Sequence, residues 1–551
     1  MTDVDAPPSP AEDAASAQQL VRSSALVALG TLTSRVTGLL RVVVLAYAIG
    51  GVAFAAKYNL ANTTPNIVYE LLLGGVLSAT LVPLFVEHAR RKDDRATDAI
   101  FTVTMTLLVV VSGLAVVFAP QIARLYTFRS SSGDLRVQRD VTTTLIRLFM
   151  PQIAFYGFTA LATAALNARR RFVAAAFAPT LNNVVVMGVL LLFARVATGS
   201  DKSWTTVEYF HRHTGLLFLL GLGTTAGIVA MALVLVPPMI RAGVPFAPRF
   251  EWRHPAVRRM VRLSGWTVGY VIANQVAVSL VLVLASARSR DPNAYLYAYM
   301  FFQLPHGLLA VSLMTTVTPE LARAASAGDD ADLRAQFGQG LRYLIVVVLP
   351  AAAAFVVLAQ PIAGVLVRGN FSAIDARLTG DTLQMFALGL LPFSVYLYAL
   401  RGFYSLQDTR TPFVVNCFEN VLNIAFALAL YPHFGVQGLA LAFSGAYAIS
   451  AIGALALFHR RVGRESRVKR LQTRAISVRS AIASGVLAIV AAPIAGAIGA
   501  ENAIHAATAA TAAATAGGLA YLAALRILGV SEIATILGLL RPRRRTSGPR
   551  V

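Results

Sequence analysis

Runs of about twenty apolar residues recur along the whole chain, and no other feature of the sequence constrains its fold as strongly. A helix needs about 20 apolar residues to cross the hydrocarbon core of a bilayer. About fourteen such runs are predicted, at residues 24–50, 59–86, 99–119, 143–168, 172–195, 214–239, 260–286, 293–318, 342–366, 378–402, 412–431, 435–457, 477–499 and 505–528. Charged residues make up only 13% of the chain, whereas soluble domains carry about 25%. The sequence therefore predicts an all-α polytopic membrane protein, with little chain left for a soluble catalytic domain.

Basic residues gather in the loops on one side of the predicted helices. The formal net charge is +22. The loops richest in lysine and arginine are residues 90–95, 169–171, 249–259, 460–474 and 541–545, and alternation of the spans puts them all on the side of the N-terminus. Because short cytoplasmic loops carry an excess of these residues, both termini are predicted to be cytoplasmic. This topology explains the positive charge without nucleic-acid binding.

The two ends of the chain are predicted to lie outside the membrane. Residues 1–23 lack the basic start of a secretory signal and are rich in Ala, Pro, Ser and acidic residues, so we expect a disordered cytoplasmic leader. Residues 531–551 form a basic tail, which we expect to attract anionic membrane lipids. The single cysteine, Cys417, excludes disulfides within the chain and cysteine-rich metal sites.

Two motifs recur about 240 residues apart. Residues 83–90 resemble residues 319–326, and Phe172 followed by Asn182 resembles Phe413 followed by Asn423. The repeat predicts two parallel six-helix bundles, at residues 24–240 and 241–458, with helices 13 and 14 in residues 459–530. Parallel repeats are typical of transporters that bind a substrate between their halves.

Two arginines, Arg35 and Arg41, lie within the first predicted span. A helix of that length is roughly 40 Å long and the hydrocarbon core about 30 Å thick, so at least one arginine is deep. Such an arginine costs about 2.5–3.5 kcal/mol and usually faces a water-filled cavity. A guanidinium pair suits phosphate or pyrophosphate, because each group donates bidentate hydrogen bonds. The alternative is that one arginine reaches a lipid head group and the other forms an internal ion pair.

Acidic residues within predicted spans are candidates for ion coupling. Glu70 is expected near the midplane, either as the static counter-ion of a deep arginine or as a proton carrier. Glu419 lies among Asn416, Asn420 and Asn423, whose oxygens could hold Na⁺. The alternative is that these amides, like Asn182 and Asn183, join neighbouring helices. The coupling ion, Na⁺ or H⁺, or a direct action of the membrane potential, is left open.

Weaker signals have simpler interpretations. His306 beside Pro305 predicts a break in the eighth span, which marks either a cavity or a plain kink. Gly223 and Gly227 form a GxxxG helix-packing pattern. The sequence contains no P-loop, nucleophile elbow or zinc motif, and no cofactor is expected.

Several sequence blocks resemble one known family. They are SRVTGLLRVVVLAYAIG and NLANTTPNIVYELLLGGVLSATLVPLF in the first two spans, FAPTLNN in the fifth, and GFYSLQDTRTPF between the tenth and eleventh. These blocks resemble the MurJ/MviN family of bacterial lipid II flippases, in the form typical of actinobacteria, within the MOP exporter superfamily. The resemblance covers about residues 24–530.

The resemblance implies a flippase of the bacterial inner membrane that exports undecaprenyl-pyrophosphate-linked peptidoglycan precursor by alternating access. Twelve helices would enclose a cationic central cavity and the last two a groove for the lipid tail. Arg35 and Arg41 match the family's first-span arginines, and Pro65 and Asn66 match a second-span motif, so these residues and Glu70 are assigned to substrate binding. Partners would be the lipid-linked oligosaccharide, anionic lipids, and proteins of cell-wall synthesis and division.

The chain departs from the family at four charged positions. Neutral residues stand there, namely Ala56, Tyr69, Met300 and Gln303. This difference puts in doubt that substrate binds with the same geometry as in the family. One alternative is a multidrug or polysaccharide-lipid exporter of the same superfamily, although the arginines favour an anionic substrate. A second alternative is a membrane prenyl- or glycosyltransferase that holds Mg²⁺-pyrophosphate with Asp93, Asp94 and Asp98. Neighbouring basic residues already neutralise these aspartates, so the protein is not expected to be an enzyme.

Overall fold

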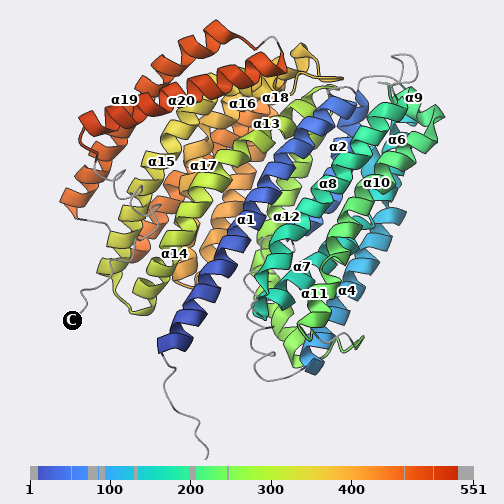
Figure 1. Ribbon diagram of the computed structural model, residues 1–551, viewed down its shortest axis with the longest axis horizontal. Coiled ribbons are helices and arrows are strands. Elements are labelled where there is room, and N and C mark those ends of the chain that lie inside the picture. The colour runs from blue at the N-terminus through green and yellow to red at the C-terminus, as the bar shows by residue number, and fades with distance from the viewer. Residues whose placement is uncertain are drawn as a thin grey trace, which may run out of the picture. The chain divides into compact units, whose positions relative to one another are not determined.

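The computed structural model describes residues 10–50, 53–71, 85, 94–128, 134–169, 171–197, 206–244, 247–463, 466–500 and 502–530 (Figure 1). Every regular element in these ranges is a helix, and they contain no strand. Within these described ranges, ten helices are long and apolar enough to span a membrane, or eleven if a bent pair is counted as one span. The predicted all-α membrane fold is confirmed. The count of fourteen stays a prediction, because much of the second predicted span lies outside the described residues.

The chain divides into two compact units, Met1–Gln275 and Val276–Val551. The division falls within a long helix, α12 (Pro255–Ala285). The other helices of unit 1 are α1 (Pro10–Ile49), α2 (Ala53–Leu71), α4 (Asp94–Val117), α5 (Ala119–Thr127), α6 (Leu135–Phe149), α7 (Gln152–Ala168), α8 (Phe172–Ala197), α9 (Val207–Arg212), α10 (Thr214–Leu233) and α11 (Val236–Arg241).

The start of α1 differs from the prediction of a disordered leader over residues 1–23. The helix begins at Pro10, so the second part of that segment is helical. Proline is well tolerated in the first turn of a helix, acidic residues there favour the helix dipole, and alanine has the highest helix propensity. The sequence PAEDAASAQQL combines all three features.

Helix α8 packs between α1 and α10 in unit 1 because small residues face it from both sides. A Cβ atom at Gly30 of α1 would lie 2.9 Å from Ala176 and from the ring of Phe177 on α8. At Gly223 and Gly227 of α10, a Cβ atom would lie 2.4 Å and 2.6 Å from side-chain atoms of α8. The GxxxG pattern is therefore a helix-packing element, as predicted.

Unit 2 contains α13 (Asp291–Pro305), η3 (His306–Ala310), α14 (Val311–Ser326), α15 (Asp330–Gly364), α16 (Ala373–Leu388), α17 (Leu390–Ser405), α18 (Arg410–Val462), α19 (Arg467–Ile498) and α20 (Ala503–Ile527). Helices α19 and α20 pack on each other and on α15. The hydroxyl of Tyr521 donates to the carbonyl of Val346 at 2.6 Å, and Leu487 and Leu525 are buried in the same core. The last two helices thus belong to the packing of unit 2.

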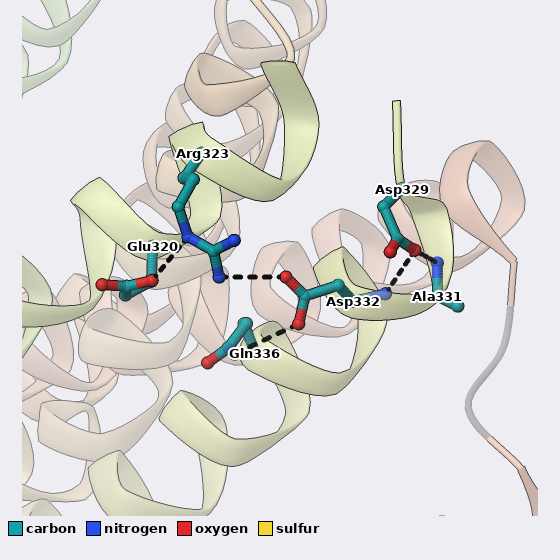
Figure 2. Close-up of polar contacts among 6 residues, drawn as sticks. All are labelled: Glu320, Arg323, Asp329, Ala331, Asp332 and Gln336. Carbon is teal, nitrogen blue, oxygen red and sulfur yellow. Dashed lines mark hydrogen bonds and ion pairs between the residues drawn. The ribbon is translucent and has the colours of Figure 1, made fainter. Parts of the chain in front are cut away.

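The turn between α14 and α15 is held by charged side chains (Figure 2). Arg323 lies 3.0 Å from Glu320 and 3.2 Å from Asp332, and Gln336 donates to Asp332. Asp329 accepts hydrogen bonds from the backbone amides of Ala331 and Asp332 in the first turn of α15, at 3.0 Å and 2.8 Å. An aspartate at this place satisfies free N–H groups and favours the helix dipole. These acidic residues therefore have a local structural role.

The glycine Gly435 breaks α18 between the two predicted spans at residues 412–431 and 435–457. Its backbone angles, φ 57° and ψ −140°, are not helical. Just before this break the hydroxyl of Tyr431 donates to Asp291 at 3.1 Å, and the guanidinium of Arg288 lies 5.9 Å from the Tyr431 ring. A Cβ atom at Gly435 would lie 2.6 Å from Arg288. The break therefore requires glycine, both for its backbone angles and for the nearby guanidinium.

We expect Gly435→Ala to lower the free energy of unfolding by about 1–3 kcal/mol, because alanine is strained at this backbone conformation. Gly453→Ala on the same helix is the matched control, since a Cβ atom there meets nothing within 4 Å. It should be neutral or stabilising by up to about 1 kcal/mol. Thermal unfolding of both variants in detergent measures the difference, and equal midpoints would contradict the assignment.

Candidate functional site

Arg35 and Arg41 lie on the same helix, α1, about 9 Å apart along its axis and about 120° around it. Arg35 is exposed within unit 1, next to the exposed apolar side chains of Leu32 and Leu39. Arg41 is half-buried, and its charge acts on the buried phenol of Tyr58 in α2. Within the described part of the chain, no carboxylate forms an ion pair with either arginine. Both guanidinium groups can therefore interact with an anionic ligand.

The turn of α1 that carries these arginines is braced by Asn183 of α8. Its side-chain amide donates to the carbonyl of Ser34 at 3.2 Å and to the hydroxyl of Thr37 at 3.1 Å. Gly38 allows this approach, because a Cβ atom there would lie 3.6 Å from the same amide. The predicted role of Asn183 in joining helices is confirmed. The brace fixes the rotation of α1 and with it the directions of both arginines.

Lys57 of α2 is a second buried cation, and the sequence had not indicated it. Its side chain is only 6% exposed, between the core residues Phe54 and Tyr58. The hydroxyls of Tyr58 and Thr224 lie 2.7 Å apart and tie α2 to α10. The sequence predicts that the second span starts at residue 59, which places Lys57 in a loop. Because α2 begins at Ala53, the lysine instead lies within a packed helix.

Pro65 and Asn66 occupy the middle of α2. Pro65 is buried inside the helix, where it cannot donate a backbone hydrogen bond. Asn66 accepts a hydrogen bond from the hydroxyl of Tyr156 on α7 at 2.6 Å and donates to the carbonyl of Asn62 at 3.2 Å. The motif thus fixes α2 against α7. Its direct contact with substrate stays a prediction.

The remaining positions singled out in the sequence lie on α2 and α13. Glu70 and Tyr69 belong to α2, but their side chains lie outside the described residues, so the pairing of Glu70 with Arg35 stays a hypothesis. Ala56 is buried. Gln303 donates to the hydroxyl of Tyr299 at 2.6 Å and Met300 is exposed.

In unit 2, Glu419 of α18 is an almost fully buried carboxylate, with an exposed fraction of 1%. The hydroxyl of Tyr447 lies within hydrogen-bonding reach of the Glu419 carboxylate. The charge of this carboxylate acts on Tyr295 of α13. No described residue gives either carboxylate oxygen a hydrogen bond of good geometry, and no described cation pairs with it. An ionised carboxylate in such surroundings is costly, so this group needs a proton or a bound cation.

Three buried asparagines surround Glu419 on α18, namely Asn416, Asn420 and Asn423. The side-chain amide of Asn420 donates to the carbonyl of Asn416 at 2.9 Å, so this contact stays within one helix. The structure places these oxygen-bearing groups on neighbouring turns, as predicted from their spacing. Among the described residues no cluster of three or more His, Cys, Asp or Glu side chains forms a metal site.

An aromatic wall lies beside Glu419 in unit 2. We define it by seven rings from α13, α16, α17 and α18: Tyr295, Tyr299, Phe302, Phe386, Phe393, Phe443 and Tyr447. His306 extends it, with its ring 4.6 Å from that of Phe393 and its Nδ1 3.0 Å from the hydroxyl of Ser394. The predicted break at His306 is a π-helical turn, and such turns are frequent at functional sites.

The motif GFYSLQDTRTPF forms the turn between α17 and α18. The Asp408 carboxylate accepts hydrogen bonds from the backbone and the hydroxyl of Thr411, at 2.9 Å and 2.6 Å. Burial alone would raise the pKa of Asp408, but these hydrogen bonds and the nearby Arg461 lower it below its usual value. The motif therefore has a structural role at the start of α18.

Comparison with known proteins identifies one family. The family model "Lipid II flippase MurJ" matches residues 45–506. A "Probable lipid II flippase MurJ" of Haemophilus influenzae is 30% identical over 429 residues, which cover 75% of this chain and 81% of that protein. Its counterpart from Rhizobium meliloti is 29% identical over 437 residues, with 77% of each chain covered.

Solved structures share the same fold. An inward closed conformation of lipid II flippase MurJ matches with a TM-score of 0.72 at 20% identity and covers 94% of this chain and 100% of that one. An inward-facing MATE-family multidrug transporter of the MOP superfamily matches with a TM-score of 0.64 at 11% identity and covers 78% and 94%. The fold is therefore that of the superfamily.

The brace on α1 can be tested by a double-mutant cycle. Asn183→Ala should lower the free energy of unfolding by about 0.5–2 kcal/mol, because two interhelical hydrogen bonds are lost. Thr37→Val removes one acceptor, so its effect should be smaller in the Asn183→Ala background than in the wild type. Unfolding in detergent measures all four proteins. Strictly additive effects would show that the two side chains do not interact.

Proposed function

The chain belongs to the lipid II flippase MurJ family, and we propose that it moves the lipid-linked peptidoglycan precursor from the inner to the outer leaflet of the bacterial inner membrane by alternating access. Membership makes it a multi-pass transporter of that membrane. The proposed substrate carries a pyrophosphate between its undecaprenyl chain and its sugar-peptide head. Its transport requires groups that bind phosphate oxygens within the membrane.

The exposed position of Arg35 supports this function most directly. Exposed Leu32 and Leu39 lie beside it on α1, and no described carboxylate neutralises it. A charge at such a depth is kept where it faces water or a ligand. We propose that Arg35 and Arg41 bind the pyrophosphate, since a guanidinium donates two parallel hydrogen bonds to phosphate oxygens. Asn183 would hold the arginines in position.

The exporter and enzyme alternatives have weaker support. A cationic drug would require acidic groups, whereas α1 presents guanidinium groups without described carboxylate partners. For the enzyme, Asp98 accepts a hydrogen bond from the backbone of Ala247 at 3.1 Å and lies 3.7 Å from Arg249. Protein groups therefore already engage this carboxylate. Asp93 lies outside the described residues.

For the driving force, we propose that Glu419 takes up the coupling cation, a proton or Na⁺. The support is its burial without a described basic partner, next to amide oxygens and the hydroxyl of Tyr447. A carboxylate that must be neutralised inside unit 2 can link cation binding to the conformation of α18. We also propose that both termini are cytoplasmic, on the basis of the loop charges.

We expect Arg35→Ala and Arg41→Ala each to abolish growth when the chain replaces a host's lipid II flippase, with normal amounts of protein in the membrane. Lysine at either position should restore transport only partly, because a point charge cannot replace a bidentate guanidinium. Arg136→Ala, at an exposed site on α6, is the matched control and should support growth. Full complementation by the Arg35→Ala, Arg41→Ala double variant would refute the proposed site.

Glu419→Gln tests the coupling proposal because it keeps the shape and removes the titratable charge. Purified protein should bind lipid II as the wild type does, while flipping in proteoliposomes should no longer respond to an imposed proton or Na⁺ gradient. Glu320→Gln, at an exposed carboxylate of the same unit, should keep the response. An unchanged gradient response of Glu419→Gln would exclude this residue from coupling.

A further inference from the structure

Residues 247–259, which precede and begin α12, combine exposed aromatic rings with arginines; we call them the arginine–aromatic segment. Phe250 is 60% exposed and Trp252 57% exposed. The exposed arginines of the segment are Arg249, Arg253, Arg258 and Arg259. The guanidinium of Arg253 lies 4.7 Å from the centre of the Trp252 ring, so charge and aromatic surface are presented together.

The segment is fixed to α4 by its backbone. The amide of Ala247 donates to the Asp98 carboxylate at 3.1 Å, and the amide of Arg249 donates to the hydroxyl of Thr102 at 2.9 Å. Both acceptors lie in the first turns of α4, which begins at Asp94. These contacts hold the chain just before the two exposed rings. Phe250 and Trp252 are thus displayed from an anchored backbone.

Two acidic groups of the segment and of α4 form ion pairs. Arg95 of α4 donates to both oxygens of Glu251, at 3.0 Å and 3.2 Å, and Asp98 lies 3.7 Å from Arg249. Within the described residues no carboxylate pairs with Arg253 or Arg258. A net positive surface therefore remains beside the exposed aromatic rings.

We propose that the arginine–aromatic segment is a docking surface for anionic phospholipid head groups. Tryptophan and other aromatic rings favour the interface between head groups and hydrocarbon, and arginines near it attract anionic lipids. The guanidinium of Arg253 and the ring of Trp252 would share one lipid, with the phosphate on the cation and the glycerol region beside the ring. This surface is separate from the proposed substrate site and does not depend on it.

The lipid contact would anchor the chain where α4 and α12 begin. The segment is bonded to α4 and continues directly into α12, the helix in which the division between the two units falls. Anionic lipid bound here would hold the start of α12 and the start of α4 at the same membrane surface. The lipid composition of the membrane would thereby act on the starts of α4 and α12, away from the arginines proposed to bind substrate.

The test uses the fluorescence of Trp252 in proteoliposomes. The chain has 3 tryptophans, so Trp204→Phe with Trp266→Phe leaves Trp252 as the only one. Vesicles contain equal parts of phosphatidylcholine and phosphatidylglycerol, with bromine on the acyl chains of one lipid or the other. We expect quenching by brominated phosphatidylglycerol to exceed quenching by brominated phosphatidylcholine, and aqueous iodide to quench weakly.

The removal of two arginines from the segment tests whether their charge determines the lipid preference. Arg253→Ala with Arg258→Ala should lower the preference for phosphatidylglycerol by about half or more, since each removed arginine weakens the attraction to anionic lipid. Arg136→Ala with Arg212→Ala, at exposed sites elsewhere in unit 1, should leave the preference unchanged. Equal quenching by both lipids, or strong quenching by iodide alone, would overturn the proposal.

A second measurement covers the case in which the single-tryptophan chain does not fold. Native mass spectrometry of the chain with all its tryptophans counts the lipids that stay bound after detergent extraction. Phosphatidylglycerol adducts should outnumber phosphatidylcholine adducts, and the Arg253→Ala, Arg258→Ala variant should lose this excess. Retention of the full excess in that variant would refute the assignment to this segment.

Discussion

The transfer of an ionised side chain from water into an apolar medium costs several kcal/mol, and the polar residues of this protein are distributed according to that cost. At several helix ends the charges are paired with each other or with backbone groups, as in the turn that Arg323 holds together. Inside the helices the exceptions are few. Arg35, Lys57 and Glu419 lie there without described partners of opposite charge, and these are the residues whose presence needs a function.

The positive and the negative residues among these exceptions lie in different units. Unit 1 contains the arginines and Lys57, whereas the buried Glu419 lies in unit 2 beside an aromatic wall. In the proposed function, unit 1 would supply the anion site and unit 2 the cation site. A transporter that couples an anionic lipid to a cation gradient needs both kinds of site.

Much of the helical architecture could be predicted from the sequence, because apolar length and small-residue spacing are local signals. The GxxxG contact at Gly227 and the amide brace at Asn183 also followed from residue type and spacing. The burial of Lys57 could not be predicted, since it depends on where α2 begins. The aromatic wall was missed for another reason. Its rings come from four helices, and the helical spacings within α13 and α18 do not show which rings of different helices meet.

The brace between Asn183 and α1 also constrains how the protein is made. Asn183 lies 149 residues after Ser34, so α1 enters the membrane long before its partner has been synthesised. At about 5–20 residues per second, the interval is roughly 7–30 s. During this time Arg35 and the polar turn around it have no helix α8 beside them. The helix that carries the arginines proposed to bind substrate must therefore remain without this brace until the fifth predicted span has been synthesised.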